Sequence, residues 1–443
     1  MSTKIGAMPT MPTLPAGWPP EMWIRLCIFS MTSSLVSGFG AYDDLYIVHA
    51  RSYMAVELAV LGAALMMTPR GTIRSIFIPI PLAAFVTWWF LSYTWSAFPA
   101  GFQGATAPDI ANIVVVVTLA SVLPIGYYIR TLIHSGYIAL ALIFVALAVQ
   151  PNKAYSPSGS LVPGLHGGFG HKNAMAPCLI ILVAAVLCFD QRRRSRLVLC
   201  SVVWGLLFFG KTSTGLATML LVVGLNIVLR HYDRARRALG RAFGLITIGS
   251  VVIFIVVSSF LLATIVTLDG KDLTFSSRSQ IWSSVWKAIK AQPLIGYGWG
   301  GVFVDQSSEP TISINRPLGF VVYHSHDAAL ELVLRLGVVG LVLYLCVLWP
   351  TIMAGVRLLK AGNPTGRFIL LVAGIIVMFG LPEVLTVFGT WLGLTAAFGI
   401  IARRLENMRG DDDSGRATSQ DVVMILPRTV FGIPKGRMKE RPT

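Results

Sequence analysis

The sequence predicts an all-α, polytopic integral membrane protein with about twelve transmembrane helices. Of its 443 residues, 55% are hydrophobic and only 13% are charged, whereas about 25% of an average soluble domain is charged. The mean hydropathy is +0.71, and the apolar residues gather in runs near the roughly 20 residues that cross a bilayer. This composition excludes a soluble globular enzyme, a disordered chain and a disulfide-stapled secreted module.

Twelve apolar runs predict the spans. They cover 23–40, 53–68, 75–95, 110–129, 132–149, 174–190, 196–210, 214–230, 243–266, 327–349, 367–382 and 385–402. The fourth and fifth are separated only by Tyr128 to Thr131, and the seventh and eighth only by a turn at Lys211. A long connection, 268–325, follows the ninth span.

The distribution of basic residues orients these spans. Fifteen Lys and Arg side chains lie in the five even-numbered connections, namely Arg70, Arg74, Arg130, Arg192, Arg193, Arg194, Arg196, Arg230, Arg234, Arg236, Arg237, Arg241, Arg357, Lys360 and Arg367. The short odd-numbered connections hold four, namely Arg51, Lys153, Lys172 and Lys211. The positive-inside rule places the even-numbered connections in the cytoplasm. We therefore expect a cytoplasmic tail at 1–22, a membrane domain at 23–402 with a periplasmic loop at 268–325, and a cytoplasmic, disordered or lipid-associated tail at 403–443.

The first polar cluster, Gly164 to Asn173, opens the sixth span on the outer side. Its glycines permit positive φ and close backbone approach. Asn173 can cap the following helix, and the cap, Lys172 and the helix dipole together suit a phosphate. A tight loop with an ordinary cap explains the same residues equally well.

Two further cations lie on the same side. Lys211 occupies the short turn Gly210-Lys211-Thr212, where it can bind an anion or snorkel to lipid phosphate. In the long loop, Ile281, Trp282, Val285, Trp286 and Ile289 form one apolar stripe at helical spacing, which predicts a helix lying in the membrane interface. Arg278 is in the first turn of that helix, where a cation opposes the helix dipole. An external anionic partner explains this placement better than helix stability does; a solvated arginine is the alternative.

The fourth cluster contains His324, His326 and Asp327, followed at helical spacing by Glu331 and Arg335. A histidine beside carboxylates at the entrance of a span can act as a general base, and Asp327 is expected to raise the pKa of His326. A charge-satisfied helix explains the pattern as well. A zinc site is a weaker alternative, because no cysteine or compact ligand set accompanies the two histidines.

Taken in order, these clusters resemble the bacterial O-antigen ligase and polysaccharide polymerase superfamily over about 88–404. The resemblance rests on four segments of the sequence. They are Gly170-His171-Lys172-Asn173, Lys211 with Thr212, Arg278 to Trp282 leading to Pro293-Leu-Ile-Gly-Tyr-Gly298, and His326-Asp327 with Gly337 and Gly340 downstream. The chain is most similar to exopolysaccharide-production polymerases of the succinoglycan type. It departs from the family at Asp327, where Asn, Ser or Gln is usual, and at Gly210-Lys211, where Ser-Arg is common.

The resemblance implies a glycosyltransferase of the bacterial inner membrane, acting on its periplasmic face without a metal or other cofactor. Its donor would be a glycan on undecaprenyl (polyprenyl) diphosphate, and its other partners a glycan acceptor, membrane lipid and other polysaccharide export proteins, but no nucleic acid. Lys211 and Arg278, assisted by Lys172, would stabilise the leaving diphosphate, and His326 would take the acceptor proton. The remaining substrate-binding residues would be His171, Asn173, His324 and Asp327.

Three other functions remain open at this stage. A sibling activity is a ligase that transfers glycan to lipid A core or to protein. A twelve-span secondary transporter would use Glu383 as its intramembrane carboxylate, although the two halves of the chain show no repeat. A scaffold of an export complex would need none of the candidate catalytic residues.

Overall fold

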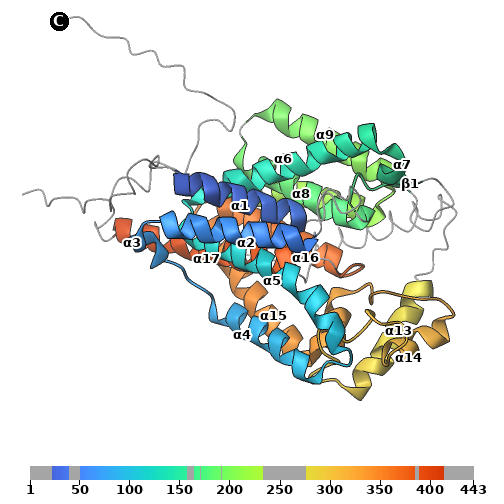
Figure 1. Ribbon diagram of the computed structural model, residues 1–443. Helices are drawn as coiled ribbons and strands as arrows, with labels where there is room; N and C mark the ends of the chain where they lie inside the picture. The colour runs from blue at the N-terminus through green and yellow to red at the C-terminus, as the bar shows by residue number, and fades with distance from the viewer. Residues whose placement is uncertain are drawn as a thin grey trace, which may run out of the picture.

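A computed structural model describes residues 22–38, 50–156, 164–169, 171–190, 192–232, 276–384 and 389–413. In this part of the chain the fold is all-α apart from one short β-hairpin (Figure 1). The elements are α1 (Met22–Gly38), α2 (Ala50–Met67), α3 (Arg70–Ile73), α4 (Ile80–Leu91), η2 (Ser92–Trp95), α5 (Pro99–Val122), α6 (Ile125–Val149), α7 (Pro151–Ala154), β1 (Tyr155–Ser156), β2 (Gly164–Leu165), α8 (Lys172–Phe189), α9 (Arg193–Phe209), α10 (Ser213–Arg230), α13 (Ser276–Ala291), α14 (Thr311–Asn315), η3 (Arg316–Leu318), α15 (Ala328–Lys360), α16 (Pro364–Gly380) and α17 (Gly389–Asp413).

The all-α membrane fold is confirmed. Within the described residues, α6, α8, α10 and α15 are long and apolar enough to cross a membrane, and shorter apolar helices occur in α1, α2, α5 and α16. Each predicted span except the ninth has a helical counterpart; the ninth, 243–266, lies outside the described residues. The total of twelve therefore stays a prediction.

Several predicted boundaries differ from the structure; α15, for example, continues to Lys360 rather than ending at 349. The turn between the fourth and fifth spans lies at Leu123–Pro124 rather than at Tyr128 to Thr131. Pro124 has no N–H to continue α5 and lies directly before α6, so the proline sets the boundary. At the other end, α17 continues to Asp413, so the segment after 402 begins as helix rather than as a tail.

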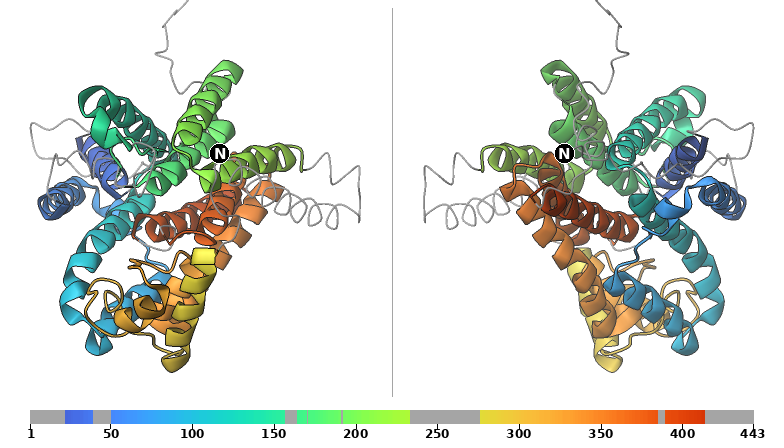
Figure 2. Two further views of the ribbon diagram at one scale, coloured as in Figure 1. Left: turned by 90° about the vertical axis from the view of Figure 1, so that its right-hand side faces the viewer. Right: turned by 90° about the vertical axis from the view of Figure 1, so that its left-hand side faces the viewer.

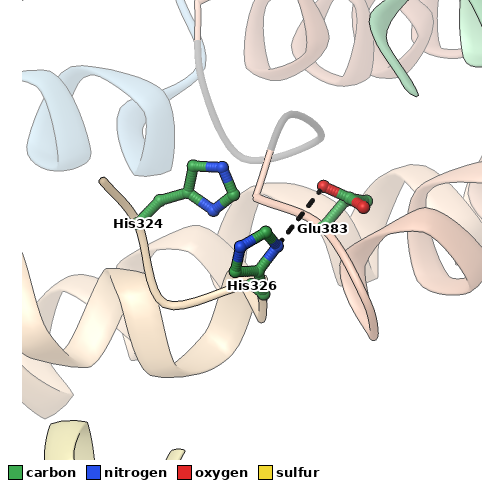
Figure 3. Close-up of side chains that lie close together, drawn as sticks. All are labelled: His324, His326 and Glu383. Atoms are coloured by element: carbon green, nitrogen blue, oxygen red, sulfur yellow. Dashed lines mark ion pairs between the residues drawn. The ribbon is translucent and has the colours of Figure 1, made fainter. Parts of the chain in front are cut away.

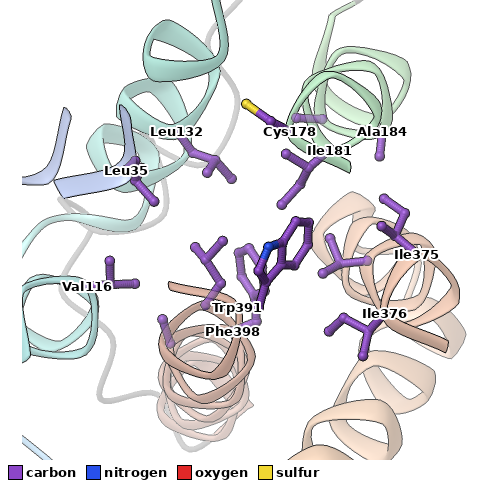
Figure 4. Close-up of a cluster of buried hydrophobic side chains, with 14 of the residues drawn as sticks. Leu35, Val116, Leu132, Cys178, Ile181, Ala184, Ile375, Ile376, Trp391 and Phe398 are labelled. Atoms are coloured by element: carbon purple, nitrogen blue, oxygen red, sulfur yellow. The ribbon is translucent and has the colours of Figure 1, made fainter. Parts of the chain in front are cut away.

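The main core surrounds α17. Trp391 and Phe398 of this helix lie among side chains of α1, α5, α6, α8 and α16 (Figure 4). Both aromatic side chains are almost fully buried, and small residues bring neighbouring helices close; a Cβ at Gly136 of α6, for example, would lie 2.9 Å from Leu182 Cβ of α8. Close packing of this kind is the main force between helices in lipid, where apolar burial alone gives little.

A second, smaller core fixes the long loop. Ile281, Val285 and Ile289 of α13 pack against a cluster that includes Phe303 and Ile314. The predicted helix and its stripe are therefore present, but the aliphatic part of the stripe faces protein, and only Trp286 is half exposed. In both views of Figure 2, α13 lies beside the first part of α15.

The helix α15 is broken at Gly337, whose backbone has φ 70° and ψ −177°. The segment Pro293 to Gly298 crosses this break and replaces the missing helical hydrogen bonds. The N–H groups of Tyr297 and Gly298 donate to the carbonyls of Leu334 and Arg335, and Val338 N donates to Pro293 O. A Cβ at Gly337 would overlap the Leu294 carbonyl, so glycine is required both for the conformation and for the approach.

The end of the bundle opposite this crossing is basic. Arg404 donates to the carbonyls of Ala120 and Leu123 at the end of α5, and Arg367 donates to Cys188 O at the end of α8. Cations at helix C-termini satisfy the free carbonyls and complement the dipole. Arg367 and Arg404 thus each satisfy free carbonyls at the end of a neighbouring helix, and the orientation of the bundle in the membrane stays a prediction.

Candidate active site

The end of the bundle away from Arg367 and Arg404 brings together residues from the predicted clusters. It contains the start of α8, the turn between α9 and α10, α13, the loop before α15 and the segment after α16. The residue that joins them is Glu383, just beyond α16, with 5% of its side chain exposed.

Glu383 contacts three of the elements that the sequence singled out. Its Oε1 accepts hydrogen bonds from Asn173 Nδ2 and, at 3.3 Å, from Arg278 Nη2. Its Oε2 lies 3.9 Å from His326 Nδ1 (Figure 3). Asn173, Arg278 and His326 are 210, 105 and 57 positions away along the chain. Burial raises the pKa of Glu383 to about 7, although Arg278 and the Asn173 hydrogen bond act against that rise.

The loop carrying His324 and His326 is held from both sides. Trp282 Nε1 donates to the Ser325 carbonyl at 3.1 Å, and the Ser325 N–H donates to Glu331 Oε2 at 2.8 Å. His326 itself has φ 55°, a left-handed conformation that is uncommon for a residue other than glycine. Such strain persists where the surroundings fix it, and it is often found at functional sites.

The two histidine rings pack together with their centroids 4.0 Å apart, in an edge-to-face arrangement. Burial, followed by His324, Arg278 and His171, lowers the pKa of His326 to about 3. The expectation that Asp327 raises this pKa is therefore wrong. Asp327 Oδ1 instead accepts the Leu330 N–H at 2.7 Å, as the N-cap of α15.

The start of α8 is capped by His171 rather than by Asn173. The Asn173 N–H donates to His171 Nδ1 at 3.1 Å, which leaves the Asn173 amide to bind Glu383. Burial and the neighbouring Lys172 lower the pKa of His171 to about 4, so the imidazole is neutral at pH 7 and can accept this bond. Lys172 also acts electrostatically on Glu383.

The Lys211 turn lies against the glycine-rich loop. A Cβ at Gly164 would come within 2.6 Å of the Gly210 carbonyl, and one at Gly210 would lie 3.3 Å from Met175 Cε in the first turn of α8. Gly164, Gly167 and Gly168 have positive φ, as expected, whereas Gly170 lies outside the described residues. Lys211 shares the left-handed conformation of His326, with φ 50°. The turn is thus placed beside the start of α8, and its joint action with Arg278 stays a prediction.

A second ion pair lies directly beneath the histidine loop. Arg335 Nη2 and Nε each lie 2.6 Å from Glu331 Oε1, and the guanidinium carbon lies 5.3 Å from the centre of the Trp299 ring. The Glu331 side chain is fully buried and that of Arg335 is 10% exposed. This is the charge-satisfied helix face that the spacing of the two residues predicts.

The sequence did not identify Glu383 as part of this site. From the sequence, Glu383 is either the intramembrane carboxylate of a transporter or a residue at the outer interface, because one glutamate near the end of a span belongs to no local motif. The single usable signal was its presence at the edge of an apolar segment, where ionisable residues often serve a function.

His324, His326 and Glu383 also offer three possible metal-binding atoms within 4.8 Å of one another. Their surroundings do not fit a divalent cation well. Glu383 already accepts from Arg278 and Asn173, and Arg278 and Lys172 add positive charge next to the carboxylate. We therefore interpret the three side chains as a proton-handling group.

The fold and the site define a multi-pass α-helical membrane protein with a cation- and histidine-lined centre at one end of its helices. The family model described as O-antigen ligase (Wzy_C) matches residues 197–345, from α9 through the first half of α15. The match supports the resemblance to the O-antigen ligase and polymerase superfamily, and the matched segment contains Lys211, Arg278 and His326. No curated protein matches the chain.

Proposed function

We propose that this protein is a membrane glycosyltransferase that joins repeat units of an exported polysaccharide, using a glycan on a polyprenyl diphosphate as donor. The observation that carries the proposal is that Arg278, His326 and Asn173 meet around Glu383. They do so at the end of the bundle away from Arg367 and Arg404. The family match supports the reaction type.

In the proposed reaction, a hydroxyl oxygen of the acceptor sugar attacks the anomeric carbon of the donor. A new carbon–oxygen glycosidic bond forms, and the bond from that carbon to the diphosphate oxygen breaks with its electron pair. Direct displacement inverts the anomeric centre. Because the donor bond is already activated, the reaction needs no nucleotide.

Each candidate residue has a defined part in this reaction. The leaving lipid diphosphate gains negative charge, and Arg278 can hold it through two parallel N–H groups. Lys211 and Lys172 add point charges from the α9–α10 turn and the start of α8. The acceptor proton passes to His326. His171, His324 and Asp327 shape the binding surface around these groups.

The proposed orientation rests on the arginines at the end of the bundle away from the site. The basic end carries Arg367 and Arg404, so the positive-inside rule assigns it to the cytoplasm. The site then faces the periplasm from the inner membrane, where a polyprenyl-linked donor presents its headgroup. Both termini lie outside the described residues, and their cytoplasmic location remains part of the proposal.

The proposal is tested with purified protein in lipid nanodiscs and a synthetic polyprenyl-diphosphate-linked repeat unit. A polymerase is expected to form products of two and more repeat units and to release the lipid diphosphate. Product made equally well by Arg278→Ala protein would overturn the assignment, and Arg316→Ala, an exposed arginine in the same outer region, is the matched control.

A ligase is the second candidate, because the matching family model carries that description. The two activities leave different intermediates in cells that lack the protein. Single repeat units on carrier lipid indicate a lost polymerase, whereas complete long chains on carrier lipid indicate a lost ligase. Solute uptake by the purified protein in liposomes, without glycan transfer, would support a transporter instead.

A further inference from the structure

Glu383 lies between the arginine and the histidine of the site and is only loosely bonded to both. We propose that Glu383 is a positioning residue that the donor diphosphate moves from Arg278 to His326, so that the base is completed only when the donor is bound. This inference rests on the proposed function and concerns the order of events in the same site.

The Glu383 carboxylate is bonded unevenly. The amide of Asn173 fixes Oε1 by a short hydrogen bond, which keeps the carboxylate in place. By contrast, the contact with Arg278 is 3.3 Å, beyond the 2.7–2.9 Å of a strong charge-assisted bond, and uses Nη2 alone. The Arg278 side chain is 27% exposed and comes from a different element, so a bidentate phosphate can replace the carboxylate as its partner.

His326 has a ring nitrogen that makes no hydrogen bond within the described residues. Its Nδ1 is buried and has no hydrogen-bond partner within the described part of the chain. Glu383 Oε2, at 3.9 Å, is about 1 Å beyond hydrogen-bond distance. The backbone of the histidine loop is held by Trp282 and Glu331, so in this proposal the gap closes by rotation of the two side chains.

The charges around the His326 ring oppose its protonation. Arg278 on α13, His171 at the start of α8 and His324 in the same loop face His326, and each lowers its pKa. Glu383 supplies the opposing charge from beyond α16, but it is shared with Arg278. Beneath the loop, Glu331 and Arg335 act in opposite directions on His324. In this state the ring is a weak base.

A bound diphosphate changes both sides of this balance. Its negative charge neutralises Arg278, and the released carboxylate can accept the Nδ1–H of His326. The ring is then held in the tautomer whose Nε2 lone pair is free for the acceptor hydroxyl, and the imidazolium formed by proton transfer is stabilised. The acceptor is deprotonated efficiently only when the leaving group is already in place.

The experiment measures the protonation midpoint of His326 with and without geranylgeranyl diphosphate, which carries no sugar and cannot turn over. Purified protein in nanodiscs is labelled with ¹⁵N-histidine, and the His326 signal, identified by its loss in His326→Gln, is followed against pH. Probe binding is measured separately by isothermal titration calorimetry. The variants are Glu383→Gln, which keeps the shape of the side chain, and Glu383→Asp, which keeps its charge; Glu309→Gln, at an exposed position of the outer loop, is the matched control.

In wild type and Glu309→Gln, the probe is expected to raise the midpoint by about one pH unit or more, a tenfold gain in proton affinity. Glu383→Gln should lose at least half of that rise, and Glu383→Asp should retain more of it than Gln. A purely structural role predicts the reverse order, because Gln fits the space better than Asp.

The contrary outcomes separate the two proposals. If the probe binds and the midpoint stays unchanged, or rises equally in Glu383→Gln, the positioning role is wrong while the donor class stands. If the probe fails to bind the wild-type protein at all, the donor class and the proposed function fail first.

Discussion

Two glutamate–arginine pairs lie at the same end of this protein, and they differ in almost every physical respect. Glu331 and Arg335 are one turn apart on α15, 2.6 Å from each other and nearly buried. Arg278 and Glu383 come from separate elements, are 3.3 Å apart, and leave the arginine 27% exposed. The first pair is closely bonded and nearly buried, whereas the second leaves the guanidinium partly exposed. We propose that distance and exposure here separate a structural ion pair from one that serves the reaction.

The strongest test of this comparison is removal of the reacting side chains. We expect Arg278→Ala and His326→Ala each to reduce transfer on the order of a hundredfold or more while the protein inserts and melts normally. Arg278→Lys should recover only part of the rate, because an ammonium cannot form the two parallel bonds. The transfer assay in nanodiscs measures the rate, and thermal unfolding in detergent measures stability. Full activity in either alanine variant would remove that residue from its assigned role.

Breaking the other pair should damage the fold first. Arg335→Ala leaves Glu331 as a buried, unpaired carboxylate, and such losses destabilise proteins by about 3–5 kcal/mol. We expect a large loss of folded protein on extraction, measured by size-exclusion yield and melting temperature. A stable Arg335→Ala protein that is merely inactive would mean that both pairs are functional and that the contrast is wrong.

The sequence predicts the pair of Glu331 and Arg335 but not the pair of Arg278 and Glu383, for a physical reason. Glu331 and Arg335 are detectable because helical spacing alone brings them together. The alternation of charge along the chain predicts that Arg278, Lys211 and His326 lie on one side of the membrane. The pairing of Glu383 with Asn173 and Arg278 depends on how α8, α13 and α16 pack, and no local pattern encodes that.

The same limit explains two smaller errors. His171 and Asn173 can each cap a helix, and only the three-dimensional course of the chain shows that His171 does so. The low pKa of His326 likewise results from burial and from the neighbouring His324, Arg278 and His171, not from the adjacent Asp327. Tertiary contacts decide both outcomes.

A pH profile should sharpen the difference between the two carboxylates. Because Glu383 has its pKa raised to about 7, kcat/KM for the donor should rise with pH through that region as the carboxylate ionises. Folding stability should move the other way. The folded protein holds this proton more tightly than the unfolded chain, so the contribution of Glu383 is greatest below its ordinary pKa and falls as pH rises toward 7.

In Glu383→Gln the acid limb near pH 7 should disappear from the residual activity, whereas Glu309→Gln should keep it. An unchanged limb in Glu383→Gln would assign the titration to another group.

The smallest effect is expected from metal removal. If Arg278, rather than a metal ion, supplies the positive charge beside Glu383, as we propose, transfer should be unchanged after dialysis against EDTA. Metal content of the purified protein, measured by inductively coupled plasma mass spectrometry, should be below one equivalent. Loss of activity on chelation, restored by one divalent ion, would assign His324, His326 and Glu383 to that ion instead.

The left-handed backbone at His326 also bears on how the protein can be engineered. A residue with a side chain pays about 1–2 kcal/mol for this conformation, and glycine avoids that penalty. Selection for heat resistance alone would therefore favour glycine at position 326 and discard the imidazole. Durability and turnover compete at this one backbone position, so any thermostabilised version should be sequenced there before its catalysis is judged.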